Sequence, residues 1–106
     1  MNDEALYDAR LELVDFVIEA FWDTPEEDDF IAVEMAFLRY LIDQQRHGHE
    51  EAFGFERVFI DEHLSQWVDD FVAETRGETD DGLFLAAALV CRGIVQFEDE
   101  IVAQMV

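Results

Sequence analysis

The chain has 106 residues, 51% of them hydrophobic, which is enough for one domain whose core buries roughly two-thirds of the surface of the unfolded chain. Acidic residues number 27 and basic residues six, all of them arginine, so the net charge is −21. This composition disfavours nucleic-acid binding because no basic patch exists, and the longest apolar run, residues 83–91, is too short to cross a bilayer.

The first predicted element is an amphipathic helix over residues 3–22. Its apolar face follows helical spacing through Tyr7, Leu11, Val14, Ile18 and Phe21. Acidic residues repeat with the same spacing on the opposite side. The link to the next element is short, so we expect the first two helices to pack as antiparallel neighbours.

The second predicted helix spans residues 24–46 and is too apolar to lie anywhere but in the middle of a bundle. Thr24 can cap it, Pro25 suits the first helical position, and Glu27 completes a capping box. Apolar residues then occupy two sides, one with Phe30, Val33, Phe37, Tyr40 and Leu41 and the other with Ile31, Met35, Leu38 and Ile42. So wide a stripe predicts a helix at the centre of a bundle. Glu34 interrupts it, and we expect this carboxylate to lie along a seam and reach solvent or an arginine.

A third element is predicted from about residue 50 to 75, after a stop at Gly48. Its expected buried side contains Phe55, Val58, Phe59, Leu64, Trp67, Val68, Phe71 and Val72. Five residues separate Phe59 from Leu64 instead of three or four, so we predict a kink or break near His63.

The last predicted helix follows a break at residues 76–82, with Thr79 or Asp80 as its cap. Its apolar stripe is expected at Ala87, Val90, Ile94, Phe97, Ile101 and Met105. The chain as a whole is therefore predicted to be a single all-α domain, 1–106, formed by a bundle of four to six helices around the central helix at about 25–46.

The acidic excess is typical of a protein from an extreme halophile such as a haloarchaeon, because molar salt screens the repulsion between its charges. Acidic faces then serve solvation more often than the binding of basic partners. Cys91 is the only cysteine and forms no intramolecular disulfide, which favours a reducing compartment. Since the first residues also lack the pattern of a signal peptide, we expect a cytoplasmic protein.

Few residues suggest catalysis or metal binding. His47 and His49, followed by Glu50 and Glu51, offer possible ligands, but no third ligand stands at helical spacing. The sequence has no serine nucleophile turn, phosphate-binding loop or Cys–His pairing. We predict a protein that is not an enzyme and that requires no metal and no cofactor.

Phe59, His63, Leu64, Trp67 and Phe71 form the pattern F-x-x-x-H-L-x-x-W-x-x-x-F. This pattern resembles a motif of the TorD/DmsD-type redox-enzyme maturation chaperones, and two further segments resemble the same family. The family's E-P-x-D-H-[IL]-x-x-E-L-x-F-M segment is matched by Glu26, Asp29, Ile31, Glu34 and Phe37, with Met35 and Leu38 as conservative replacements. The family's closing F-Y-x-x-L-A helix is similar to the segment with Phe84, Leu89 and Phe97. The chain has Phe30 where the family has histidine, and it resembles only the C-terminal half of a usual member.

The resemblance implies a cytoplasmic chaperone for an exported molybdenum oxidoreductase of the DMSO, TMAO or nitrate reductase type. It implies binding of the twin-arginine signal peptide and the immature body of that enzyme, before export and during cofactor insertion. The expected peptide-binding residues are Glu26, Asp28, Asp29, Phe30, Glu34, His63 and Trp67. Acidic residues at the helix start would pair with the two arginines, and an apolar groove near Phe30 and Trp67 would hold the hydrophobic stretch.

Purely structural roles for these residues stay open. Trp67 could pack in the core, His63 could bond a backbone carbonyl at the kink, and Asp29 could stabilise the start of its helix. The alternative function is an acidic helical dimerisation or scaffold module that binds no peptide and covers its apolar patch with a second copy.

Overall fold

The computed structural model describes residues 3–22, 29–78 and 82–105. These residues form α1 (Asp3–Trp22), α2 (Asp29–Arg46), α3 (Glu51–Phe59), a π-helical turn η2 (Ile60–Leu64), α4 (Ser65–Glu78) and α5 (Gly82–Met105). No strand occurs within these ranges, and the prediction of an all-α bundle is confirmed. None of the helices in the described ranges is long and apolar enough to cross a membrane.

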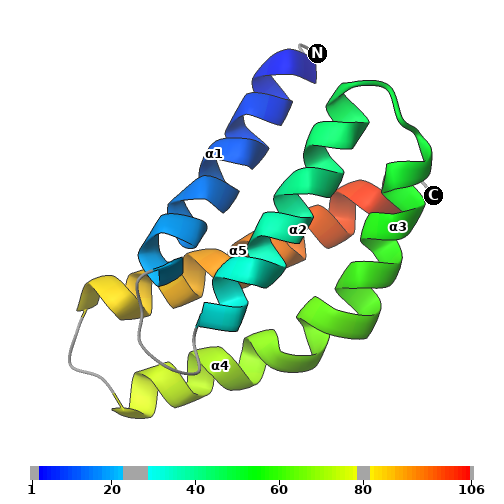
Figure 1. Ribbon diagram of the computed structural model, residues 1–106. Coiled ribbons are helices and arrows are strands. Elements are labelled where there is room, and N and C mark those ends of the chain that lie inside the picture. Colours follow the sequence, from blue (N-terminus) through cyan, green and yellow to red (C-terminus); the bar gives the residue numbers. More distant parts are fainter. Residues whose placement is uncertain (1–2, 23–28, 79–81, 106) are drawn as a thin grey trace.

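The helices pack around one apolar core (Figure 1). Helices α1 and α2 run antiparallel side by side, α3 lies on the other side of α2, and α5 crosses behind them. The fully buried side chains come from several helices and include Val14, Phe21, Ile31, Met35, Leu38, Ile42, Ile60, Leu64 and Val72. The rings of Phe21 and Phe71 meet edge to face at 5.4 Å, which joins α1 to α4.

Helix α1 follows the prediction closely. It begins and ends at the expected residues, and Leu11, Val14 and Phe21 of its predicted face are buried while Tyr7 and Ile18 are partly buried. One buried residue was not expected, because Arg10 is only 2% exposed.

Helix α2 ends where Gly48 was expected to stop it. Gly48 has a φ of 90°, a conformation that glycine adopts without strain. The amide of His49 donates to the carbonyl of Gln44, and the amide of Gly48 donates to that of Gln45, which are the two bonds of a Schellman motif. The chain reverses direction at this cap, so that α3 lies next to α2. The predicted cap residues Thr24, Pro25 and Glu27 lie outside the described residues.

The expectation that α2 is enclosed on all its apolar sides is wrong for one face. Ile31, Met35, Leu38 and Ile42 are fully buried, but the side chains of Phe30, Val33, Phe37 and Tyr40 are 41–65% exposed. Helix α2 packs mainly on α1 and α3, and these two neighbours leave part of its circumference open. An apolar face thus remains at the surface beside α3.

Other apolar residues placed in the core by their spacing are also exposed. They are Phe55 and Val58 on α3, and Phe97 and Met105 on α5. Helix α5 buries a stripe rotated by about one residue from the prediction, formed by Ala87, Cys91, Ile94, Val95, Glu98 and Val102. The sequence has more apolar positions than the core has places, so spacing alone does not select the buried side.

The predicted break near His63 is a π-helical turn. The amide of Ser65 donates to the carbonyl of Ile60, five residues earlier, so η2 holds one more residue than an α-helical turn. This extra residue accounts for the five-residue spacing between Phe59 and Leu64, both of which are buried. The chain changes direction between α3 and α4 (Figure 1).

Candidate functional site

An open groove lies between the C-terminal half of α2 and α3. Its volume is about 600 Å³. Apolar side chains dominate its lining, together with His49, His63, Gln44 and Glu51; the apolar members are Phe37, Tyr40, Leu41, Ala52, Phe55, Val58 and Phe59. We call this feature the α2–α3 groove. Its position follows from the Schellman cap, which sets α3 beside the end of α2.

Aromatic rings contact one another along the α2–α3 groove. Phe37 meets Phe59 edge to face at 4.8 Å, and the His63 ring stacks on Phe59 at 5.2 Å. Tyr40 lies stacked near Phe37 at 6.3 Å. The rim residues Phe37, Tyr40, Phe55 and Val58 are 46–61% exposed. Such a group of exposed apolar side chains marks a binding surface more often than a random part of the surface does.

Three of the predicted site residues meet at the N-terminal half of α2. The ring of Phe30 lies edge to face on Trp67 at 5.2 Å, and the Trp67 indole Nε1 donates a hydrogen bond of 3.2 Å to Glu34 Oε1. Trp67 also packs on Phe71 at 6.0 Å. The partner of Glu34 is therefore an indole N–H on α4 instead of an arginine.

The remaining predicted residues are distributed differently. His63 lines the α2–α3 groove instead of contacting the Phe30 and Trp67 pair. Glu26 and Asp28 lie outside the described residues, as does the side chain of Asp29, whose backbone begins α2. Asp29 and Phe37 are eight positions apart on one helix, which corresponds to about 12 Å along its axis.

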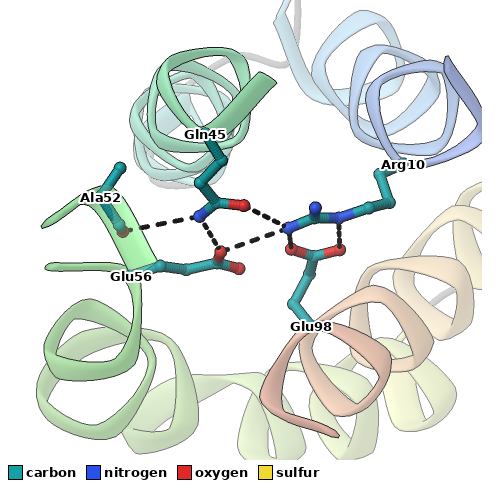
Figure 2. Close-up of polar contacts among 5 residues, drawn as sticks. All are labelled: Arg10, Gln45, Ala52, Glu56 and Glu98. Atoms are coloured by element: carbon teal, nitrogen blue, oxygen red, sulfur yellow. Dashed lines mark hydrogen bonds and ion pairs between the residues drawn. The ribbon is translucent and has the colours of Figure 1, made fainter. Parts of the chain in front are cut away.

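A cluster of four buried polar side chains lies behind the α2–α3 groove (Figure 2). Arg10 of α1, Gln45 of α2, Glu56 of α3 and Glu98 of α5 are each no more than 4% exposed. We call them the Arg10 cluster. The Arg10 guanidinium holds Glu98 with two bonds, from Nε at 2.8 Å and from Nη2 at 2.6 Å. Its Nη2 also donates to Gln45 Oε1 at 2.8 Å and to Glu56 Oε1 at 3.3 Å.

Glu56 is the least satisfied member of the Arg10 cluster. Its Oε1 accepts a hydrogen bond of 2.6 Å from Gln45 Nε2, but its Oε2 is buried without a hydrogen-bond donor among the described residues. Burial raises the pKa of Glu56 to about 9, and the Glu98 carboxyl also raises it, whereas Gln45 and Arg10 lower it. For Arg10, burial by itself would lower the pKa, but the bonds and charges of Glu98 and Glu56 outweigh it and raise the pKa.

Sequence reasoning missed the Arg10 cluster, although each helix contains a signal for it. Arg10 falls between Tyr7 and Val14 with spacing 3 and 4, within the apolar stripe of α1. Gln45, Glu56 and Glu98 each occupy a stripe position of their own helices in the same way. A polar residue at a stripe position on four helices indicates mutual partners, because a buried charge needs compensation.

The histidines do not form a metal site with their acidic neighbours. His47 Nδ1 lies 2.8 Å from the carbonyl of Asp43, and His49 lies 3.5 Å from Glu51. Within the described ranges, no group of three or more His, Cys, Asp or Glu side chains is arranged to hold a metal ion. Cys91 is fully buried, and burial raises the pKa of its thiol to about 12, so it behaves as a small apolar core residue.

Fold and groove together define an all-helical bundle with an open apolar surface between two of its helices, an architecture suited to holding a segment of another protein. The model of the nitrate reductase delta subunit family matches residues 1–73, which is 73 of the 106 residues. Comparisons with curated proteins and with solved structures found no match.

The chain therefore belongs to the nitrate reductase delta subunit family, the NarJ/TorD-type chaperones that assist the maturation of redox enzymes. The expected family is confirmed, and so is the expectation of a chaperone instead of an enzyme. Membership implies binding of the catalytic subunit of a molybdoenzyme. The matched residues include the lining of the α2–α3 groove and end before α5, so the resemblance at Phe84, Leu89 and Phe97 stays a prediction.

Proposed function

We propose that this chain is a cytoplasmic chaperone that binds the twin-arginine signal peptide, and part of the immature body, of an exported molybdenum oxidoreductase. The observation that carries the proposal is the α2–α3 groove, whose rim exposes Phe37, Tyr40, Phe55 and Val58. A hydrophobic stretch of a peptide gains free energy by covering such side chains, at about 25 cal/mol for each Å² of apolar surface removed from water.

The two arginines of the peptide would bind at the start of α2. Glu26, Asp28 and Asp29 supply carboxylates in this segment, which pair well with guanidinium groups. An extended peptide covers the roughly 12 Å from Asp29 to Phe37 with about four residues. We therefore expect tight binding from peptides in which about four residues separate the arginines from the apolar stretch.

Phe30, Glu34 and Trp67 lie between these two ends of the proposed site. The hydrogen bond from Trp67 to Glu34 and the contact with Phe30 hold α4 against α2. Phe30 remains 41% exposed, so it can contact the peptide between its arginines and its apolar stretch. His63 lines the α2–α3 groove, at the end of the proposed path that holds the apolar stretch.

The experiment is a titration with a synthetic peptide that carries two adjacent arginines followed by an apolar stretch, in molar KCl. We expect Phe37→Ser to weaken binding by at least about tenfold, the usual effect of removing an aromatic anchor. Phe97→Ser is the matched control, because Phe97 is 41% exposed but does not line the groove. Equal affinities for wild type and Phe37→Ser would refute the groove as the site.

The salt dependence of the binding affinity distinguishes the contribution of the acidic residues from that of the apolar groove. Glu26→Gln with Asp29→Asn should weaken binding more in dilute buffer than in molar KCl, because salt screens exposed ion pairs. Phe37→Ser should weaken binding in both. An equal loss for the acidic variant at both salt concentrations would contradict the pairing of these carboxylates with the arginines.

The exposed rim of the groove also fits the alternative function, in which a second copy covers it. A net charge of −21 on each chain opposes this association unless salt screens it. Sedimentation in molar KCl distinguishes the two functions. A monomer whose groove binds the peptide supports the chaperone, and a dimer that Phe37→Ser dissociates supports the dimerisation module.

A further inference from the structure

The Arg10 cluster directly joins the two walls of the α2–α3 groove. Gln44 lines the groove on α2 and Gln45 follows it, while Phe55 lines the groove on α3 and Glu56 follows it. The bond of 2.6 Å from Gln45 Nε2 to Glu56 Oε1 therefore connects α2 to α3 behind the groove. A longer bond of 3.5 Å from the same nitrogen reaches the carbonyl of Ala52, another lining residue. Figure 2 shows these bonds converging from separate helices.

The charges of the Arg10 cluster do not balance if every group is ionised. Arg10 supplies one positive charge, and Glu56 and Glu98 supply two carboxyls that are at most 1% exposed. The guanidinium gives its two shortest carboxylate contacts to Glu98, at 2.6 and 2.8 Å, and only a contact of 3.3 Å to Glu56. An ionised Glu56 would thus add an uncompensated negative charge in a dry interior, which is strongly unfavourable.

One proton removes this imbalance. The charged or polar groups that face Glu56 are Arg10 from α1, Gln45 from α2 and Glu98 from α5, and on its own helix the Ala52 carbonyl lies beside the Gln45 amide. With a proton shared between the two carboxyls, one guanidinium balances one remaining negative charge. The buried Oε2 of Glu56, which has no donor among the described residues, then becomes a donor itself.

We propose that Glu56 and Glu98 share one proton and that this proton acts as a latch on the α2–α3 groove: while it is bound, α3 is fixed against α2, and its release to solvent loosens α3. The latch makes apolar binding in the groove depend on pH, since the groove loses one wall when α3 moves. This regulation of the groove rests on the proposed function, whereas the latch itself can be tested without any ligand.

The direction of the pH effect follows from the buried pair. The pKa of Glu56 is raised from its ordinary 4.5 to about 9, so the folded chain holds this proton more tightly than the unfolded chain does. The stabilisation is complete below pH 4.5 and is lost as the pH rises toward about 9.

The test is amide hydrogen exchange of residues 51–59 from pH 6 to 10 in molar KCl, corrected for the intrinsic pH dependence of exchange. We compare wild type with Glu56→Gln, in which the neutral amide replaces the protonated carboxyl, and with Glu62→Gln, the same change at an exposed site. We expect wild type and Glu62→Gln to lose protection in α3 at least about tenfold between pH 7 and 10, and Glu56→Gln to keep it. A parallel loss in all three proteins would overturn the latch.

Two further measurements cover the other outcomes. If Glu56→Gln does not fold, the side-chain carboxyl carbons of the wild type are titrated by NMR. A carboxyl that titrates well above the others supports the shared proton. Titration of all 27 acidic side chains below about pH 6 overturns it. The twin-arginine peptide is then titrated at pH 7 and 10. If hydrogen exchange follows the expected pattern but the peptide does not bind, the proposed function is refuted and the latch is supported.

Discussion

At three positions on α3 the usual distribution of side chains is reversed: one charged side chain is buried on the inner side of the helix, and two apolar side chains are exposed on the outer side. On the inner side Glu56 is fully buried with Arg10, Gln45 and Glu98, and on the outer side Phe55 and Val58 are more than half exposed. At Val14, Leu38 and Leu64 the usual distribution holds, because these apolar side chains are fully buried. The contrast suggests that stability alone does not explain α3: its charged side fixes the position of the helix and its apolar side remains available for binding.

The largest effect is expected from removing the charge at the centre of the inner side. Arg10→Ala leaves Glu98 buried without its guanidinium, and breaking a buried pair in this way costs about 3–5 kcal/mol of unfolding free energy. Urea denaturation in molar KCl measures the loss. The matched control is Arg39→Ala, which removes an exposed bridge to Asp15.

Replacing the charged members of the Arg10 cluster together tests whether the cost of Arg10→Ala comes from leaving a buried charge without its partner. A variant with Arg10→Met, Glu56→Leu and Glu98→Met removes the charges and the need to compensate them, so we expect it to be more stable than Arg10→Ala alone. If the triple variant is the less stable of the two, the cluster contributes more than mutual compensation of its buried charges.

The next prediction concerns the difference between the two carboxyls of the inner side. Glu98 accepts the two short bonds from Arg10, so Glu98→Gln should cost about 1.5–3 kcal/mol at pH 7, the range for hydrogen bonds to charged groups. Glu56→Gln should not lower the unfolding free energy and should raise it at pH 7, because glutamine resembles the protonated acid but does not have to take up a proton on folding. Equal losses would mean that the proton is not held by the pair as described.

A smaller effect is expected at the edge of the outer surface, where Trp67 bonds Glu34. Trp67→Phe keeps an aromatic ring against Phe30 and Phe71 but removes the indole donor, which should cost about 0.5–1.5 kcal/mol. Trp22→Phe is the control, since Trp22 is 62% exposed, and should leave stability almost unchanged. Thermal unfolding of both variants decides whether the bond to Glu34 contributes.

The smallest effect is expected at the surface ion pair between α1 and α2. Arg39 Nε lies 2.7 Å from Asp15 Oδ1, but the side chains are 42% and 49% exposed. We expect Arg39→Ala to cost less than about 1 kcal/mol in dilute buffer and still less in molar KCl. A loss that matches that of Arg10→Ala would remove the distinction between buried and exposed charges on which the comparison depends.

Sequence spacing predicted the fold where each helix has one dominant apolar face. It gave the limits of α1, the stop at Gly48 and, from the distance between Phe59 and Leu64, the break that is η2. It did not decide which apolar side of α2, α3 and α5 is buried, because these helices have two apolar sides and the packing of their neighbours makes that selection.

The candidate site was predicted only in part for a related reason. The motif resemblance predicted that Phe30, Glu34, Trp67 and His63 belong to the site. Trp67 contacts both Phe30 and Glu34, and His63 lines the groove. The rim residues Phe55 and Val58 were assigned to the core, since an exposed aromatic and a buried one look alike in a sequence. The Arg10 cluster was missed because charged residues were assumed to face solvent, and its members come from four separate helices.

The most direct test of the groove as the binding site is an NMR titration of ¹⁵N-labelled protein with the twin-arginine peptide in molar KCl. If the peptide binds in the groove, the largest shifts at saturation lie at Phe37, Tyr40, Phe55 and Val58, with smaller shifts at the start of α2. Shifts confined to another surface, such as the exposed Leu13 and Phe16 of α1, would contradict it.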